Sequence, residues 1–323
     1  MKKHDDMGRV TTQGAKATWG AIALIGSLLA GCGSAPVGEG ESDRPRVVTT
    51  TTVIAHWTQE LGGDAIELVP LMDPGVDPHI YEPVPADTVA IESADLIFYN
   101  GYNLEPGLIR IIEATGIDAT VVPVGESVSP LDMEQEGQRV PDPHVWGDVS
   151  HAVTMVETMR DQLIALLPEE RDRIQQNATD YITQLRSLDT WVTEQVATIP
   201  ANQRQLVTTH DAFQYYARAY GLEVPGTLIG ISTEEQPSAQ TVQRLVDTIR
   251  TLNVPAIFAE TTLNPQLITT VAQEAGVPLA EQELYSDSLG APGSRGDSYI
   301  TMIEANTEAI VVNLGGQFTP FSP

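Results

Sequence analysis

Four residues of this chain have the types and surroundings of metal ligands. His79 and His144 each end an Asp-Pro-His tripeptide, although the chain has only six histidines. Proline fixes φ and disfavours helical backbone in the preceding residue, so both imidazoles are expected on stiff loops. His210 and Asp287 follow apolar runs that indicate strands. Singly, each histidine is more simply a structural residue, but three imidazoles and one carboxylate suffice to surround a divalent cation tetrahedrally.

The charge of the chain restricts its partners. Its 323 residues include 44 Asp and Glu against 17 Lys and Arg, which gives a formal net charge of −27. Such an acidic surface argues against nucleic acid and anionic membrane faces as partners. Solubility is the simplest explanation of the charge, and a role in gathering cations is the alternative. The length predicts roughly two domains.

The N-terminal segment has the features of a lipoprotein signal peptide. A basic start precedes the apolar run 19–30, which suits a signal peptide better than a membrane span. Leu29-Ala-Gly-Cys32 matches a bacterial lipobox, so we expect removal of residues 1–31 and a lipid on Cys32. Cys32 is the one cysteine of the sequence, which leaves the exported part without a disulfide or a thiolate metal site. Residues 32–45 are rich in Gly, Pro and Ser and predict a flexible tether.

Residues 46–167 are expected to form an N-terminal α/β lobe. The predicted strands are 47–54, 66–70, 95–99 and 120–124, and the predicted helices are 85–93, 106–115 and 150–167. This alternation is typical of a parallel sheet with helices on both faces. Such sheets bind ligands at the carboxyl ends of their strands.

A long helix is predicted over residues 168–199. After Pro168 no Gly or Pro interrupts it, and its apolar residues recur every three or four positions: Ile174, Ala178, Tyr181, Leu185, Leu188, Val192 and Val196. At about 1.5 Å per residue it reaches roughly 45 Å, enough to join two lobes. We interpret it as a rigid connector. A coiled-coil dimer is the alternative, but the stripe lacks sustained heptads, so a monomer is expected.

Residues 200–323 repeat the alternation and predict a C-terminal lobe. The predicted strands are 205–209, 256–259 and 277–280, and the predicted helices are 211–220, 238–252, 265–275 and a last one from Asp297 or Ser298 to Leu314. The predicted fold class is therefore α/β, with two lobes, each a mainly parallel sheet flanked by helices, joined by one long rigid connecting helix. The acidic run 134–136 is interpreted as an exposed loop.

Several motifs occur in the order found in one protein family. They are Gly75-Val-Asp-Pro-His-Ile-Tyr-Glu-Pro83, Asp142-Pro-His-Val-Trp146, His210-Asp-Ala-Phe-Gln-Tyr-Tyr-Ala217, Ile257-Phe-Ala-Glu260, and Ser286-Asp-Ser-Leu289 with Gly296-Asp-Ser-Tyr299. The chain thereby resembles the cluster A-I (cluster 9) metal-binding solute-binding lipoproteins of bacterial zinc and manganese ABC importers. The resemblance implies two lobes around a buried metal, with His79 and His144 as ligands from the first lobe and His210 and Asp287 from the second. It also implies delivery of the ion to an ABC permease and its ATPase.

The third ligand position distinguishes the two metals in this resemblance. Family members dedicated to manganese commonly have Glu where this chain has His210, and three nitrogens with one carboxylate favour zinc. Zinc members often carry a histidine-rich loop between the first two ligands, and residues 133–139 contain no histidine, which keeps manganese open. One Zn²⁺ is therefore the expected transported ligand, with Mn²⁺ as the alternative. Glu260 is a candidate to hydrogen-bond a ligand histidine and fix its tautomer.

Two other functions remain open at this point. A zinc hydrolase needs an open coordination position and a general base, and the sequence has no His-Glu-x-x-His motif, so the chain is not expected to be an enzyme. An adhesin would fit the lipid anchor equally well, and metal content would separate it from an importer component. In each case we expect an extracytoplasmic, membrane-anchored lipoprotein on the periplasmic side or the cell surface.

Overall fold

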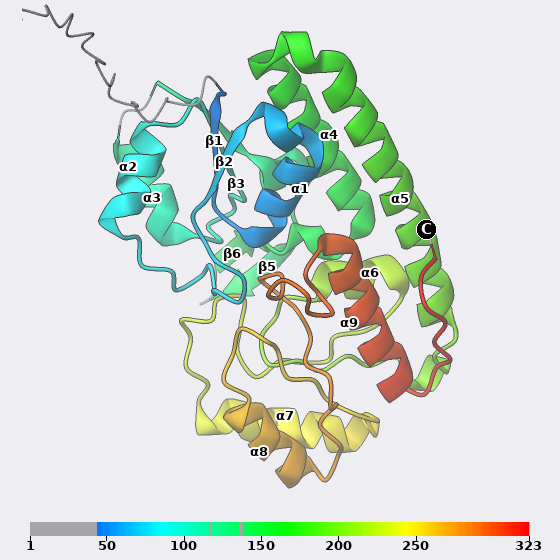
Figure 1. Ribbon diagram of the computed structural model, residues 1–323. Coiled ribbons are helices and arrows are strands. Elements are labelled where there is room, and N and C mark those ends of the chain that lie inside the picture. Colours follow the sequence, from blue (N-terminus) through cyan, green and yellow to red (C-terminus); the bar gives the residue numbers. More distant parts are fainter. Residues whose placement is uncertain (1–43, 116–117, 136–137, 323) are drawn as a thin grey trace, which may run out of the picture. The chain divides into compact units, whose positions relative to one another are not determined.

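The computed structural model describes residues 44–115, 118–135 and 138–322 (Figure 1). The predicted signal peptide, Cys32 and nearly all of the predicted tether lie outside these residues. Within the described part of the chain, no helix is both long enough and apolar enough to cross a membrane.

Four parallel strands form the sheet of the first half, in the order β2-β1-β3-β4. Their bounds are β1 Arg46–Thr49, β2 Glu67–Pro70, β3 Leu96–Tyr99 and β4 Thr120–Pro123. Val47 lies opposite Leu68 on one side and Leu96 on the other, which sets the register. The predicted parallel sheet of the first half is therefore present.

Helices cover both faces of this sheet (Figure 1). They are α1 Thr52–Gly62, α2 Pro85–Glu92, α3 Pro106–Ala114 and α4 Val149–Leu166. Because side chains alternate across a strand, Val48 and Ile97 face one way and pack with apolar residues of α2 and α3. Val47 and Phe98 face the other way, into the core that α1 and α4 complete.

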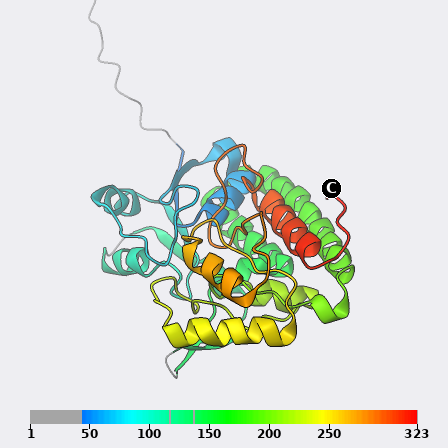
Figure 2. The same cartoon turned by 90° about the horizontal axis from the view of Figure 1, so that it is seen from below.

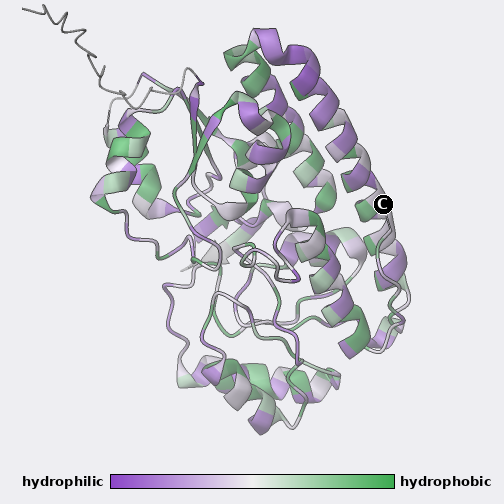
Figure 3. Cartoon of the chain, viewed as in Figure 1, coloured by the Kyte–Doolittle hydropathy of each residue, from purple (hydrophilic) through white to green (hydrophobic). Residues whose placement is uncertain are grey.

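The helix α5 (Arg171–Ala197) follows a 3-10 turn at Pro168–Glu170. It packs against α1 and α4 of the first half and against α6 (Gln214–Tyr220) and α9 (Tyr299–Asn313) of the second. The predicted apolar stripe is buried from Ile174 to Val196, whereas much of the rest of α5 is hydrophilic (Figure 3). The apolar stripe of α5 therefore packs against both halves of the chain. The lobe boundaries at residues 167 and 200 stay a prediction.

The second half keeps parallel pairing in very short segments. Isolated parallel bridges join Gln205 to Glu223, Ile257 to Leu279 and Glu260 to Leu284. The N–H of Phe258 also donates to the carbonyl of Val207 (3.0 Å), so the segments 205–209 and 256–260 are neighbours. On one face these segments pack against α7 (Ala239–Leu252) and α8 (Gln266–Ala275), which lie side by side (Figure 2).

Some predicted element boundaries are wrong. The strand predicted over 47–54 ends at Thr49, because Thr51 Oγ1 accepts a hydrogen bond from the N–H of Ile54 (3.4 Å) and caps α1. The helix predicted from Asp211 begins at Gln214. The strands predicted in the second half are reduced to the isolated bridges.

The acidic run 134–136, interpreted as an exposed loop, differs where it is described: residues 134 and 135 belong to a strand, and residue 136 lies outside the described residues. Residues Asp132–Gln135 (β5) and Gln138–Pro141 (β6) pair as antiparallel strands, with Asp132 opposite Pro141. Polar and charged residues are the majority in these two strands, so they lack the apolar alternation that predicts a strand. The hairpin leads directly to the Asp-Pro-His motif of His144.

Candidate metal centre

Each of the four candidate residues follows a strand or a bridged segment. His79 lies in the loop after β2, and His144 follows β6. His210 comes directly after the segment 205–209, and Asp287 comes shortly after Leu284, which is bridged to Glu260. Ligand-binding loops in α/β proteins occupy the carboxyl ends of parallel strands, which fits the positions of His79, His210 and Asp287. His144 instead follows a strand of the antiparallel pair.

The two Asp-Pro-His motifs share one local structure. In the first, Asp77 Oδ1 accepts a hydrogen bond from the N–H of His79 (2.9 Å). In the second, Asp142 Oδ1 accepts one from the N–H of His144 (3.0 Å). An Asp side chain that binds the backbone two residues later forms a tight turn. The aspartate and the proline of each motif therefore fix the backbone conformation of the histidine that follows them.

The structure brings all four candidate side chains together. One ligand atom from each of His79, His144, His210 and Asp287 lies within 4.8 Å of the others, and this is the one such group found among the described residues. The shortest separations are 3.1 Å between Nε2 of His79 and Nε2 of His144, and 3.2 Å between His210 Nε2 and Asp287 Oδ2. His144 Nε2 lies 3.4 Å from Asp287 Oδ1, and His79 Nε2 lies 4.0 Å from Asp287 Oδ2. Bonds of about 2.0 Å in a tetrahedron separate ligand atoms by about 3.3 Å, so the group matches a small tetrahedral ion.

The group is buried, and some of its polar atoms have no hydrogen-bond partner among the described residues. All four side chains are buried. His210 Nε2 and both carboxylate oxygens of Asp287 have no hydrogen-bond partner among the described residues. His210 Nε2 and Asp287 Oδ2 are close but lack hydrogen-bond geometry. Buried polar atoms are nearly always paired, so these three atoms are suited to binding a cation.

Two carboxylates outside the group orient two of its imidazoles. Asp142 Oδ1 lies 2.7 Å from His144 Nδ1. Glu260 Oε2 lies 2.5 Å from His210 Nδ1, and Glu260 Oε1 accepts a hydrogen bond from the backbone N–H of His210 (2.8 Å). A carboxylate beside Nδ1 keeps a proton there, so Nε2 is the nitrogen available to a cation. Sequence reasoning named Glu260 but missed Asp142, for which the Asp-Pro-His motif was the available signal.

Comparison with known proteins identifies the family. The model of the family ZnuA, described as zinc-uptake complex component A, periplasmic, matches residues 47–313. The chain belongs to this family. The matched span contains the four clustered residues and Glu260.

Relatives of this ZnuA-family chain cover most of its length. The manganese-binding lipoprotein MntA of Halalkalibacterium halodurans is 34% identical over 294 residues, which are 91% of this chain and 96% of that protein. The manganese ABC transporter substrate-binding lipoprotein PsaA of Streptococcus pneumoniae is 32% identical over 301 residues, again 91% and 96%. The solved structure of the periplasmic zinc-binding protein TroA of Treponema pallidum matches with a TM-score of 0.80 at 34% identity, over 84% of this chain and 99% of that one. The predicted family and α/β fold class are confirmed.

The electrostatics of the ZnuA-family centre prepare it for a cation. Burial lowers the pKa of His79 to about 3, although Asp287 acts in the opposite direction. Burial also opposes protonation of His210, but the carboxylates of Glu260 and Asp287 outweigh it and hold the pKa of His210 well above its ordinary value. Burial would raise the pKa of Asp287, but the neighbouring imidazoles keep it well below its usual range. A negative charge therefore persists at the centre, and a proton on His210 offsets it when no metal is bound.

The loop that carries Asp287 is bound to the first half of the chain on both sides. The indole N–H of Trp146 donates to the carbonyl of Ser286 (3.0 Å). The N–H of Leu289 donates to Thr52 Oγ1 (2.9 Å), and the N–H of Gly75 donates to Ser288 Oγ (2.8 Å). Gly75 has φ near +84°, where a side chain would be strained. Asp287 is thus held by the elements that also carry His79 and His144.

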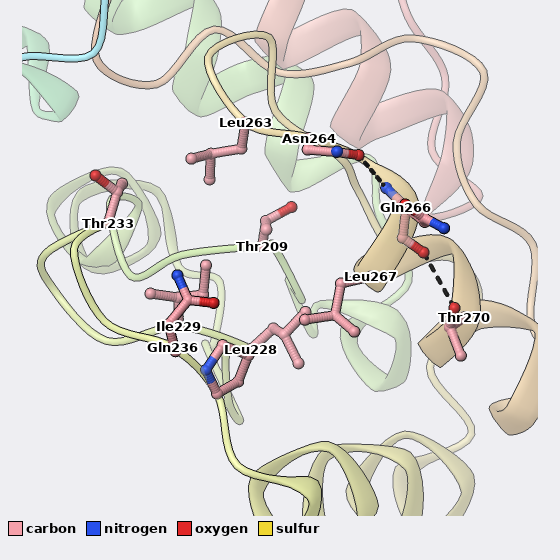
Figure 4. A pocket seen from close by; sticks show the side chains of 11 residues that line it. Thr209, Leu228, Ile229, Thr233, Gln236, Leu263, Asn264, Gln266, Leu267 and Thr270 are labelled. Atoms are coloured by element: carbon pink, nitrogen blue, oxygen red, sulfur yellow. Dashed lines mark hydrogen bonds between the residues drawn. The ribbon is translucent and has the colours of Figure 1, made fainter. Parts of the chain in front are cut away.

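Other polar residues lie apart from this group. The rings of His56 and Tyr181 are 6.1 Å apart, and the rings of His151 and Tyr215 are 5.4 Å apart. A cavity of about 400 Å³ lies between α8 and the 228–237 segment, with Thr209 between them (Figure 4). None of the four clustered residues lines that cavity.

Proposed function

We propose that this chain captures one Zn²⁺ ion with His79, His144, His210 and Asp287 and releases it to a membrane permease. The observation that carries the proposal is the buried group of three imidazole nitrogens and a carboxylate, with its atoms close to tetrahedral spacing. As a member of the ZnuA family, the chain is the substrate-binding component of a metal-importing ABC transporter. We propose that the two lobes, residues 46–167 and 200–323, move about the connecting helix 168–199 to release the ion.

The choice of zinc rests on the ligand atoms. Three neutral imidazoles and one carboxylate suit a borderline cation, and zinc lies above manganese in intrinsic affinity for such sites. Carboxylate- and carbonyl-rich sites suit manganese better. The names of MntA and PsaA make manganese the alternative substrate, whereas the name of TroA favours zinc.

The four protein ligands also bear on catalysis. A hydrolytic zinc site leaves one position open for water, whereas four protein ligands complete a tetrahedron. The family is described by zinc uptake, and the names of MntA and PsaA describe manganese binding and ABC transport. We therefore propose a binding role without turnover, in an extracytoplasmic lipoprotein that is anchored through Cys32, acts as a monomer, and works with an ABC permease and its ATPase.

Competition titration tests this proposal. The metal-free chain from Ser34 onward would be titrated with Zn²⁺ and with Mn²⁺ against a chelator of known affinity. We expect one ion per chain and tighter binding of zinc. Absence of stoichiometric binding of either ion would refute the proposal.

A substitution at the third ligand tests the choice of metal. His210→Glu exchanges a nitrogen for an oxygen and should move the preference from zinc towards manganese. His151→Glu is the matched control, because His151 lies outside the group. If His210→Glu leaves the preference where it was, the argument for zinc fails.

A further inference from the structure

A second cavity reaches the buried group from the surface. Its volume is about 230 Å³, and His79 is part of its wall. The wall also includes Asn103 and Glu234, which are exposed, and Pro143 and Ile231, which are buried. The cavity wall therefore includes both exposed residues and His79 of the buried group.

His79 is the most accessible of the four clustered residues. Its exposed fraction is 4%, against 2% for Asp287 and 0% for His144 and His210. Two larger cavities, of about 400 and 700 Å³, have none of the four residues in their walls. Access to the group is thus greatest on the side of His79.

The lining of the 230 Å³ cavity suits a cation. Glu234 is its one carboxylate, and none of its lining residues is Lys or Arg. A carboxylate at the entrance of a narrow passage raises the local concentration of cations and their association rate. The remaining wall is largely proline and small polar side chains, and Pro141 and Pro143 give it a stiff side.

One wall of this cavity is attached by a single side-chain hydrogen bond to the loop that carries His79. The hydroxyl of Thr233 donates to Asp77 Oδ2 (2.7 Å). Thr233 lies between the lining residues Ser232 and Glu234, so this bond holds the wall against the His79 loop. Breaking it would widen the passage without moving Asp287, whose loop is bonded elsewhere.

We propose that the ion enters and leaves through this cavity, with Glu234 as the first carboxylate that it meets and His79 as the first ligand. This inference rests on the proposed function, because it assumes that the group binds the ion. It adds a route and an entry residue that lie outside the four ligands.

Rate measurements on variants of the cavity wall test the route. Ser232→Phe would narrow the passage, and Val140→Phe, at another residue of the wall, would do so if the first variant fails to fold. Because a barrier on the path does not change the bound or the free state, the association and dissociation rate constants for Zn²⁺ should fall together, each by about tenfold, with the affinity unchanged. Thr270→Phe is the matched control: it fills the cavity of Figure 4, which the 228–237 segment also borders.

Charge provides an independent arm of the same experiment. Glu234→Gln should slow Zn²⁺ association by roughly fivefold at low salt, and the difference should shrink as salt screens the charge. Association can be followed by stopped-flow fluorescence, since the ring of Trp146 is 5.5 Å from that of His144.

The outcomes separate the route from the proposed function. If the unaltered chain binds neither Zn²⁺ nor Mn²⁺, the proposed function fails and the route fails with it. If the unaltered chain binds zinc and both wall variants keep its rates, the route alone is wrong. A changed affinity at an unchanged association rate would also overturn it, because the substitutions would then act on the site.

Discussion

Replacement of Glu260 by Gln tests how the centre holds His210. The two carboxylate oxygens of Glu260 have separate tasks: Oε2 faces His210 Nδ1, and Oε1 accepts the backbone N–H of His210. An amide can perform only one of them. If the amide oxygen of Gln accepts the backbone N–H, its NH₂ group faces Nδ1 of His210. The ring proton then moves to Nε2, the atom that would bind the metal. If the amide turns over, its NH₂ group meets the backbone N–H, and a buried donor is left unpaired.

The expected loss can be estimated for either orientation. A buried unpaired donor costs about 1–3 kcal/mol, and loss of a carboxylate that orients a ligand imidazole typically costs about 10–100-fold in metal affinity. We therefore expect Glu260→Gln to weaken zinc binding by about 10–100-fold, or about 1.4–2.7 kcal/mol. Chelator competition at neutral pH would measure it.

Asp142→Asn is the matched control for this experiment. A single oxygen, Asp142 Oδ1, accepts from both the backbone N–H and Nδ1 of His144, and Oδ2 has no hydrogen-bond partner among the described residues. Asn can keep its oxygen in that position and leave the tautomer of His144 unchanged. Zinc affinity should fall much less than in Glu260→Gln, although both variants lose one negative charge. Equal losses in the two variants, or a Glu260→Gln affinity within about twofold of wild type, would refute the tautomer argument.

Three further predictions concern release, protons and stability. Thr233→Val removes the hydrogen bond to Asp77 and should speed zinc dissociation by roughly tenfold, as measured by stopped flow with excess chelator. Thr227→Val, six residues earlier in the chain, should leave the dissociation rate unchanged. Equal dissociation rates in the two variants would contradict the prediction. Because the pKa of His210 is raised in the metal-free chain, zinc must displace its proton, and zinc affinity should rise with pH up to the pKa of His210. Calorimetry in buffers of different ionisation enthalpy should find about one proton released per ion. Release of no proton would show that His210 was already neutral. Burial raises the pKa of Glu105 to about 7 despite hydrogen bonds from Asn100 and Thr50, so the folded chain holds a proton that the unfolded chain loses above its ordinary carboxyl pKa. The free energy of unfolding should therefore fall by about 3 kcal/mol as pH rises from about 4.5 to 7, and denaturant unfolding should find this dependence reduced in Glu105→Gln; an unchanged dependence would exclude Glu105 as its source.

Much of the candidate site is readable from the sequence because its signals are local. In each Asp-Pro-His motif the turn is made within three residues, so the setting of His79 and His144 follows from their neighbours alone. The apolar stripe of α5 is equally local, since it depends on helical spacing. The ligand roles of His210 and Asp287 can be predicted only with the family motifs, because no local sequence pattern links these residues to the first half.

The features that sequence reasoning missed depend on contacts between distant segments. The segments 205–209 and 256–260 are too short to be recognised from the sequence as neighbours, and the structure joins them by the hydrogen bond from the N–H of Phe258 to the carbonyl of Val207. The Thr233–Asp77 bond joins residues 156 positions apart, and nothing in either motif indicates it. The start of α1 was predicted as strand for another reason. Val53 and Ile54 favour strands, but Thr51 caps a helix there.

The hydrogen bonds of the Asp287 loop restrict how the centre can open. Ser286, Ser288 and Leu289 are all bonded to the first half, beside His79 and His144. His210 is instead held by Glu260, on the bridged segments that pack against α7 and α8. Separation of the His210 side from the other three residues would break one ligand bond and the hydrogen bond from Thr233 to Asp77. Withdrawal of Asp287 would break its ligand bond and all the hydrogen bonds that join its loop to the first half. Under the proposed function, release of the ion therefore begins with His210 and with the adjacent wall that Thr233 holds closed.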